Sequence, residues 1–248
     1  MSEQNYFKFS NSVVIAPLGA VLLIWIVYWM ELRFQTNFND FGLYPRRISG
    51  LQGLLFSPFI HGSLEHLYNN TIPLALLLAS LFYFYRDIAI KVLVFGALLS
   101  GLITWGIGRP SYHIGASGVI YLLASFIFFK GIFTKHYRLV ALSLIVVFIY
   151  GSLLWYIFPV KNGISWEGHL GGFLTGFGLA FLVKGSVPSP KKFAWEHDDY
   201  NEEEDEFLKH FDEEGNFIET IHEEHSQEEN TLQVKYFYKK NSEDVDSE

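Results

Sequence analysis

The chain lacks cysteine altogether: none occurs among its 248 residues. It therefore forms no disulfide, and it offers neither a cysteine nucleophile nor a cysteine ligand for a metal. The string His-Glu-x-x-His, which binds zinc in one large class of hydrolases, is also absent. Between Asp40 and Asp198 the only aspartate is Asp87, in an expected loop. The central part of the chain thus has no pair of aspartates for acid–base catalysis.

Acidic residues are scarce in most of the chain and abundant near its C-terminus. Residues 185–248 hold 20 of the 26 acidic residues and 6 of the 18 basic ones, a net charge of −14, whereas residues 1–184 carry a net charge of +6. Half of all residues are hydrophobic, and the mean hydropathy is +0.21. We therefore divide the chain into an N-terminal segment (1–12), an apolar membrane body (13–184) and an acidic tail (185–248) that we expect to be flexible.

Six apolar runs lie in the body. A bilayer's hydrocarbon core is about 30 Å thick, so a spanning helix needs roughly 20 mostly apolar residues. The first run is longer than the apolar part of a signal peptide, and no small-residue cleavage site follows it, so we expect it to stay in the membrane. The sequence predicts an all-α fold, namely a polytopic membrane protein built as a bundle of six transmembrane helices. The expected spans are residues 13–30, 64–85, 89–108, 115–129, 139–158 and 166–183.

The basic residues that flank these spans indicate which way the chain sits. With six spans both termini share one side of the membrane, and cytoplasmic loops carry more Lys and Arg than the others. Nine such residues fall on the side of the termini and five on the opposite side. We therefore predict that both termini, including the acidic tail, are cytoplasmic. The second, fourth and sixth spans then enter from the non-cytoplasmic face, and their first turns lie at a common depth.

Polar residues gather at those three helix starts. Polar groups within spans are costly, and they usually face a cavity or a partner. For each residue alone, a hydrogen bond that cross-links two helices is the alternative explanation. Their occurrence together at one depth favours a functional site. These residues are His61, His66 and Asn70 at the second span, Ser117 at the fourth and His169 at the sixth.

The fourth span opens with the string Gly115-Ala116-Ser117-Gly118. Flanking glycines allow a tight backbone and the close approach of a substrate. A helix start also offers unpaired N–H groups and a partial positive charge, which suit an oxyanion that forms beside Ser117. Taken alone, the string is most often a packing motif, so Gly115 and Gly118 are also candidates for helix packing.

His169, Gly172 and Gly176 share one face of the sixth span because they are spaced by three and four residues. The two glycines form a small-xxx-small pair that lets another helix approach closely. One interpretation is a packing groove with an incidental histidine. The other is that the groove brings His169 within hydrogen-bond distance of Ser117, whose hydroxyl needs a base to become a good nucleophile.

His66 and Asn70 share a face of the second span because they are four residues apart. Facing the serine, they would donate hydrogen bonds to a developing oxyanion, together with the backbone N–H groups of Ala116 and Ser117. Asn69 lies about 100° further around the helix, so we expect it to face elsewhere.

The three motifs, in this order on alternate spans, resemble those of the rhomboid family of intramembrane serine proteases. The resemblance covers about residues 42–184. It implies a six-helix core, a Ser117–His169 dyad without an aspartate, and Tyr121 packed on the ring of His169. It also implies an oxyanion site with His66 and Asn70, and a cavity open to water on the non-cytoplasmic side. The matching strings are His61-x4-His66-x3-Asn70, Gly115-x-Ser117-Gly118-x2-Tyr121 and His169-x2-Gly172-x3-Gly176.

We therefore expect an intramembrane serine endopeptidase that cleaves single-pass transmembrane proteins and needs neither a metal nor an organic cofactor. Transmembrane substrates and membrane lipids are the expected partners, no nucleic acid is expected, and the sequence identifies no partner for the tail. By analogy, the membrane is a bacterial cytoplasmic membrane. The alternative is a non-catalytic, client-binding adaptor or chaperone of the same family, although such relatives lack the serine or the histidine. A transporter or channel would place its polar residues along a path or at the midplane.

Overall fold

The computed structural model describes residues 9–149, 155–161, 163–184, 193, 195, 199–212 and 214–218. In this part of the chain the regular structure is helical, apart from two isolated β-bridges. The chain divides into two compact units, residues 1–191 and 192–248. The predicted all-helical fold is confirmed for the described residues, and most of the N-terminal segment and of the acidic tail lies outside them.

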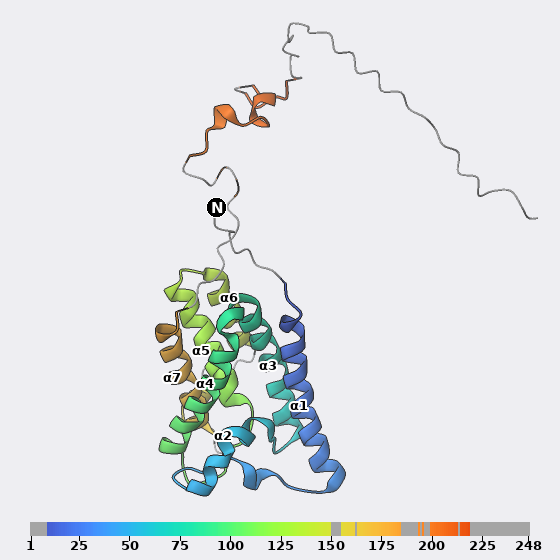
Figure 1. Ribbon diagram of the computed structural model, residues 1–248, viewed down its shortest axis with the longest axis vertical. Coiled ribbons are helices and arrows are strands. Elements are labelled where there is room, and N and C mark those ends of the chain that lie inside the picture. Colours follow the sequence, from blue (N-terminus) through green and yellow to red (C-terminus); the bar gives the residue numbers. More distant parts are fainter. Residues whose placement is uncertain are drawn as a thin grey trace, which may run out of the picture. The chain divides into compact units, whose positions relative to one another are not determined.

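Among the described residues, the six longest helices make up the body of the first unit (Figure 1). Each of the six predicted runs overlaps one of them. Three are long and apolar enough to cross a membrane: α1 (Ser12–Phe34), α3 (Leu64–Phe84) and α4 (Arg86–Ile107). The other three are shorter: α5 (Ser117–Phe133), α6 (Tyr137–Ile149) and α7 (Trp166–Leu182).

The predicted ends differ from the observed ones by up to four residues in most runs, and the fourth and fifth runs differ in ways that bear on the site. The fourth was expected from residue 115, but α5 begins at Ser117, because Gly115 has a φ of +106°, outside the helical range. The fifth was expected to reach residue 158. Residues 150–154 of that run lie outside the described part, and Trp155–Ile157 form the short 3₁₀ helix η4. Because α5 begins at Ser117, this residue stands at the point where the α4–α5 loop becomes a helix.

Short helical turns connect α1 to α3, and they hold the loop that leads into α5. Leu43, which lies between the first and the second of these turns, exchanges backbone hydrogen bonds of 3.0 and 2.8 Å with His113 of the α4–α5 loop. The N–H of Gly115 donates to the carbonyl of Ser57 at 2.8 Å. The backbone before Ser117 is thus fixed by a second loop. The turns of that loop are η1 (Asn39–Phe41), η2 (Ile48–Gln52), α2 (Gly53–Phe56) and η3 (Ser57–Phe59).

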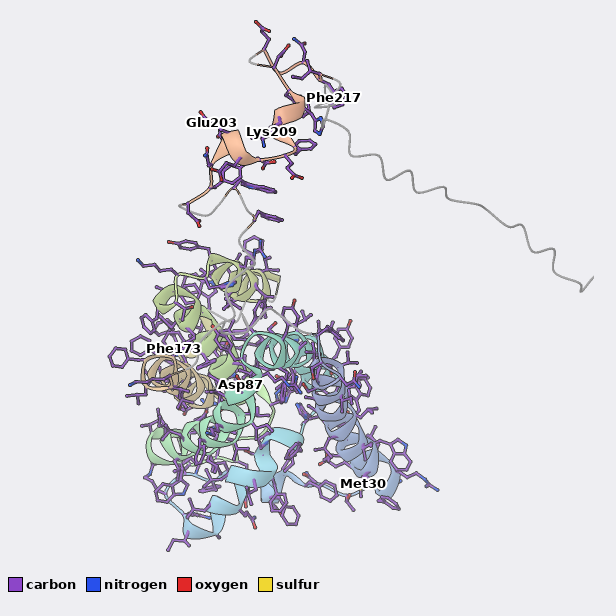
Figure 2. The ribbon with its side chains drawn as sticks, turned by 45° about the horizontal axis from the view of Figure 1, so that its top comes forward. Met30, Asp87, Phe173, Glu203, Lys209 and Phe217 are labelled. Carbon is purple, nitrogen blue, oxygen red and sulfur yellow. The ribbon has the colours of Figure 1, made fainter. Side chains whose placement is uncertain are left out.

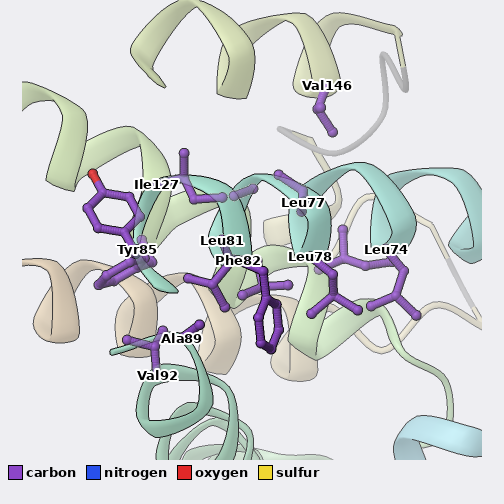
Figure 3. Packing of buried hydrophobic residues seen from close by; sticks show 14 of the residues in the cluster. Leu74, Leu77, Leu78, Leu81, Phe82, Tyr85, Ala89, Val92, Ile127 and Val146 are labelled. Atoms are coloured by element: carbon purple, nitrogen blue, oxygen red, sulfur yellow. The ribbon is translucent and has the colours of Figure 1, made fainter. Parts of the chain in front are cut away.

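The apolar core lies among the later turns of α3, α5 and α6 and the start of α4. Figure 3 shows side chains from these helices meeting in one cluster. Leu77 and Leu81 of α3 are fully buried, as are Phe126 and Ile127 of α5. Since lipid tails are as apolar as leucine, such contacts stabilise a membrane protein by close packing rather than by removal from water.

The backbones of α5 and α7 approach one another at glycines, and these two helices pack most extensively in the unit. A Cβ atom on Gly172 would lie 3.0 Å from the Cβ of Tyr121 and closer still to the carbonyl oxygen of Gly118. A Cβ on Gly176 would overlap the carbonyl oxygen of Leu122. The predicted small-xxx-small pair therefore faces α5.

Polar side chains of α5 also reach α7 further along. The hydroxyl of Ser125 donates to the carbonyl of Phe173 at 2.8 Å. The buried ammonium of Lys130 donates to the carbonyls of Ala180 and Val183, at 3.2 and 2.5 Å. Because the last carbonyls of a helix have no internal donor, Lys130 serves as a cap for α7.

The second unit contains two short 3₁₀ helices, η6 (Glu202–Glu204) and η7 (Leu208–His210). An isolated antiparallel bridge pairs Phe211 with Phe217. Figure 2 labels Phe217 in this unit.

Candidate active site

Ser117 and His169 lie side by side at the starts of α5 and α7. The Oγ atom of Ser117 is 3.0 Å from Nε2 of His169. Ser117 is the first residue of α5, and His169 lies in the first turn of α7, where its ring is buried. The two side chains come from positions 52 residues apart, and the hydroxyl proton has an acceptor within hydrogen-bond distance.

The other ring nitrogen of His169 faces a backbone carbonyl. Its Nδ1 atom lies 2.8 Å from the carbonyl oxygen of Tyr156 in η4. A carbonyl oxygen only accepts, so Nδ1 carries the proton and the Nε2 of a neutral ring accepts from Ser117. The Tyr156 carbonyl thus fixes the tautomer and the orientation of the ring. A carboxylate performs that task in a Ser-His-Asp triad.

Tyr121 covers one face of the His169 ring. The two rings stack with their centroids 4.2 Å apart and an angle of 16° between their planes. Tyr121 lies one turn after Ser117 on the same helix. The helix that carries the hydroxyl therefore also restricts the plane of the imidazole.

His61 supports the backbone that precedes Ser117. Its Nδ1 atom lies 3.3 Å from the carbonyl of Phe59, which fixes that nitrogen as the donor, and its Nε2 accepts the N–H of Ala116 at 3.5 Å. Burial, followed by the charge of His66, lowers the pKa of His61 to about 4, so that the ring is neutral at neutral pH. The N–H of Ala116, predicted as an oxyanion donor, points to this ring instead.

His66 and Asn70 come from the first two turns of α3. Ser63 caps this helix by accepting the N–H of His66 at 3.1 Å. The amide of Asn70 donates to the carbonyl of His66 at 2.9 Å, and its second N–H remains as a donor for a ligand. A Cβ atom on Gly115 would lie 2.6 Å from Nε2 of His66, so only glycine allows His66 to approach the loop before Ser117.

A cavity of about 980 Å³ joins these groups. Its wall combines polar side chains from three helix starts with the apolar surface of Pro73 and Ile120. Five of its lining residues are ones that the sequence predicts for the site: His66, Asn70, Ser117, Tyr121 and His169.

Other residues of the cavity wall were not expected there. Asn69, predicted to face elsewhere, also lines the cavity, so two neighbouring positions of α3 contribute to its wall. Three charged side chains belong to the wall as well: Glu65, Arg109 and Lys161. Of these, Glu65 and Lys161 are exposed. The edge of the cavity that solvent reaches is therefore charged, and the dyad lies further inside.

Comparison with known proteins identifies the family. Residues 49–186, more than half of the chain, match the Rhomboid domain. The chain belongs to the rhomboid family. An uncharacterized protein of Mycobacterium tuberculosis is 34% identical over 185 residues, which cover 70% of this chain and 75% of the relative. An uncharacterized protein of Mycobacterium leprae is 31% identical over 185 residues, which cover 70% of this chain and 72% of the relative.

As a rhomboid with long apolar helices, the protein is an integral membrane protein. Two groups near the dyad were not predicted from the sequence: the side chain of Glu167 and the backbone carbonyl of Tyr156. Glu167 is buried, and its Oε1 atom accepts the backbone N–H of Arg109 at 3.1 Å. The available signal was an acidic residue at the start of an apolar span, where charge is costly. The Tyr156 carbonyl gave no signal, because any residue supplies a carbonyl.

Proposed function

We propose that this rhomboid is an intramembrane serine endopeptidase that cleaves single-pass transmembrane proteins. In this proposal α1, α3, α4, α5, α6 and α7 all cross a bacterial cytoplasmic membrane, and both termini and the acidic tail (185–248) are cytoplasmic. The cavity then opens to the non-cytoplasmic side, from which water enters. A substrate reaches the cavity from the lipid with its scissile segment extended.

The observation that carries the proposal is the distance of 3.0 Å between Ser117 Oγ and an acceptor nitrogen of His169. Proximity alone would leave open which ring nitrogen holds the proton. The Tyr156 carbonyl, 2.8 Å from Nδ1, supports the tautomer that a general base requires. The stacked Tyr121 ring supports the orientation, so a dyad without a carboxylate has both of its requirements met.

Acylation begins when Ser117 Oγ attacks the scissile carbonyl carbon and its proton passes to Nε2 of His169. The carbonyl bond opens, and its oxygen takes the negative charge. Donors for this oxyanion are the side chains of His66 and Asn70 and the N–H groups in the first turn of α5, which have no acceptor within the helix. The partial positive charge of the helix start adds to this stabilisation.

The imidazolium of His169 then protonates the leaving amine as the C–N bond breaks, which leaves an ester on Ser117. Water from the cavity attacks this ester while His169 takes its proton. Collapse of the second tetrahedral intermediate releases the carboxylic acid and returns the proton to Ser117. Transmembrane substrates and lipids are the proposed partners, and every proton transfer runs through His169 without a metal or an organic cofactor.

The test is cleavage of a single-span reporter protein in proteoliposomes, with a metal chelator present throughout. Wild type is expected to cleave, and Ser117→Ala and His169→Ala are expected to lower the rate on the order of ten-thousandfold. Ser143→Ala is a matched control, because that hydroxyl donates to the carbonyl of Leu139 within its own helix at 2.7 Å. The control should cleave like wild type.

A fluorophosphonate probe decides the case in which the reporter is not cleaved. Labelling of Ser117 in folded wild type, lost in Ser117→Ala, would show an activated serine that needs another substrate. Folded wild type that neither cleaves nor labels contradicts the protease proposal, and it favours the client-binding adaptor.

A further inference from the structure

Side chains of the α4–α5 loop hold the first turn of α7. Arg109 and His113 of this loop contact Ser165 and Glu167, which lie at the start of α7. We call these four residues the clamp. The dyad follows directly on both sides, since Ser117 comes four residues after His113 and His169 two residues after Glu167. The clamp therefore joins the two segments whose relative position sets the dyad geometry.

One half of the clamp is the contact between His113 and Ser165. His113 Nε2 lies 3.2 Å from the carbonyl of Arg109 and must donate to it, so its Nδ1 accepts the hydroxyl proton of Ser165 at 2.5 Å. The Ser165 oxygen also caps α7 by accepting the N–H of Gly168 at 3.3 Å. The carbonyl of Ser165 accepts the N–H of His169 at 3.2 Å. This half reaches the backbone of the catalytic histidine itself.

The other half of the clamp is the contact between Glu167 and Arg109. Glu167 Oε1 accepts the Arg109 N–H at 3.1 Å and lies 3.7 Å from the guanidinium Nε. The same guanidinium donates to the carbonyl of Ile164, just before α7. Glu167 is only 1% exposed. Its second oxygen, Oε2, is buried without a hydrogen-bond partner among the described residues.

A buried carboxylate of this kind needs an explanation. Taking a charge out of water is expensive unless good partners replace the water, and here one oxygen is served and the other is not. The pair contributes little net stability on that account. Its effect on geometry is more specific, because breaking it would let the loop before Ser117 move away from α7.

We propose that Glu167 is a positioning residue, which holds the α4–α5 loop against α7 through Arg109 and thereby sets the distance between Ser117 and His169. The inference rests on the proposed protease function. Catalysis by a positioned dyad is sensitive to distance, and a displacement of about 1 Å lowers a rate by roughly a hundredfold. Helix packing tolerates larger displacements than the dyad distance does, so a contact that fixes this distance affects the rate more than the stability.

The experiment compares Glu167→Ala and Glu167→Gln with wild type in the proteoliposome assay. We expect Glu167→Ala to lower kcat by roughly 10- to 100-fold and to change KM less than about twofold, because the chemical step depends on the Ser117–His169 distance more steeply than substrate binding does. Glutamine keeps an oxygen that accepts the Arg109 N–H but loses the charge. Its kcat should be intermediate, about fivefold below wild type.

Asp87→Asn is the matched control. This carboxylate also lies in the first turn of a helix, α4, but it is exposed and does not line the cavity. Its kcat and KM should equal those of wild type. Gel filtration and thermal unfolding in detergent establish that each variant is folded at the assay temperature.

The outcomes separate this inference from the proposed function. Wild type that cleaves, together with folded Glu167→Ala at full kcat, overturns the positioning role alone. If Glu167→Ala does not fold, Glu167→Gln decides: a lowered kcat at an unchanged unfolding midpoint supports the role, and a wild-type kcat overturns it. Wild type that neither cleaves nor labels with the fluorophosphonate contradicts the protease function, and the positioning role with it.

Discussion

The first turns of α3, α5 and α7 differ sharply from the later turns of the same helices. The first two turns carry polar side chains with hydrogen-bond partners: Ser117 and His169 bond to one another, and Asn70 bonds to the carbonyl of His66. The later turns bury side chains such as Leu78 and Phe126, which need no polar partner. We call these regions the polar half and the apolar half. Hydrogen bonds dominate the contacts of the first, and close packing dominates those of the second, to which Ser125 and Lys130 add hydrogen bonds between α5 and α7.

Because of this difference, we expect substitutions in the polar half to change mainly the catalytic rate and substitutions in the apolar half to change mainly the stability. A polar side chain that orients the dyad affects the rate more than the stability, since few apolar contacts depend on it. A buried leucine affects stability more than the rate, because it touches no reacting group. The glycine contact between α5 and α7 extends over both halves. Gly118 of α5 lies near the dyad, and Gly176 lies further along α7. Substitutions there should change the rate and the stability together.

Among substitutions that leave the dyad side chains in place, the largest effect is expected from Gly172→Ala. The added Cβ would overlap the carbonyl oxygen of Gly118 and lie 3.0 Å from the Cβ of Tyr121, so the backbones of α5 and α7 must separate. We expect a loss of about 2 kcal/mol in the free energy of unfolding and a fall of roughly a hundredfold in kcat. Thermal unfolding in detergent and cleavage of the single-span reporter measure the two effects.

Gly178→Ala is the control for this substitution. Gly178 lies on the same helix, but a Cβ there would meet no atom within 4 Å. Because alanine favours a helix over glycine by roughly 0.5–1 kcal/mol, this variant should be as stable as wild type or slightly more stable. Equal behaviour of the two alanine variants would show that the polar half does not depend on the glycine contact.

Much of the fold and part of the site could be predicted from side-chain identity at helical spacing. Runs of apolar residues gave the helices, and the spacing of His169, Gly172 and Gly176 predicted a face toward Ser117. The fifth run was extended too far, because apolar residues continue beyond α6 into the segment that forms η4. Hydropathy alone cannot distinguish a helix from an apolar turn after it.

The contacts that orient the dyad could not be predicted, because they involve the main chain. The Tyr156 carbonyl and the Ala116 N–H are present whatever the side chain is. The clamp was missed for a different reason. Arg109 and Glu167 are 58 residues apart, and only the folded chain brings their ion pair together. Whether these residues act in catalysis stays a prediction.

A smaller effect, confined to stability, is expected from Leu78→Ala in the apolar half. Leu78 of α3 is 2% exposed and lies in the core cluster (Figure 3). Removing its side chain leaves a cavity, and we expect a loss of about 2 kcal/mol in the free energy of unfolding. The kcat of the folded variant should stay at the wild-type value. Thermal unfolding and the reporter assay are again the measurements.

Leu76→Ala makes the same chemical change two residues earlier, at a side chain that is 44% exposed. Because that leucine loses few protein contacts, its unfolding midpoint should lie close to that of wild type. A large fall in kcat for folded Leu78→Ala would contradict the division into two halves, since it would show that the apolar packing sets the dyad geometry directly.

The smallest effect is expected from Tyr121, whose ring stacks on His169 at 4.2 Å. An aromatic pair of this kind contributes about 0.5–1.5 kcal/mol, so Tyr121→Ala should lower kcat by roughly fivefold with little change in folding. The Tyr121 hydroxyl is buried without a hydrogen-bond partner among the described residues. Tyr121→Phe keeps the ring and should therefore retain the wild-type kcat. A loss of activity in the phenylalanine variant would assign the role to the hydroxyl, and equal activity of wild type and Tyr121→Ala would remove the ring from the positioning of His169.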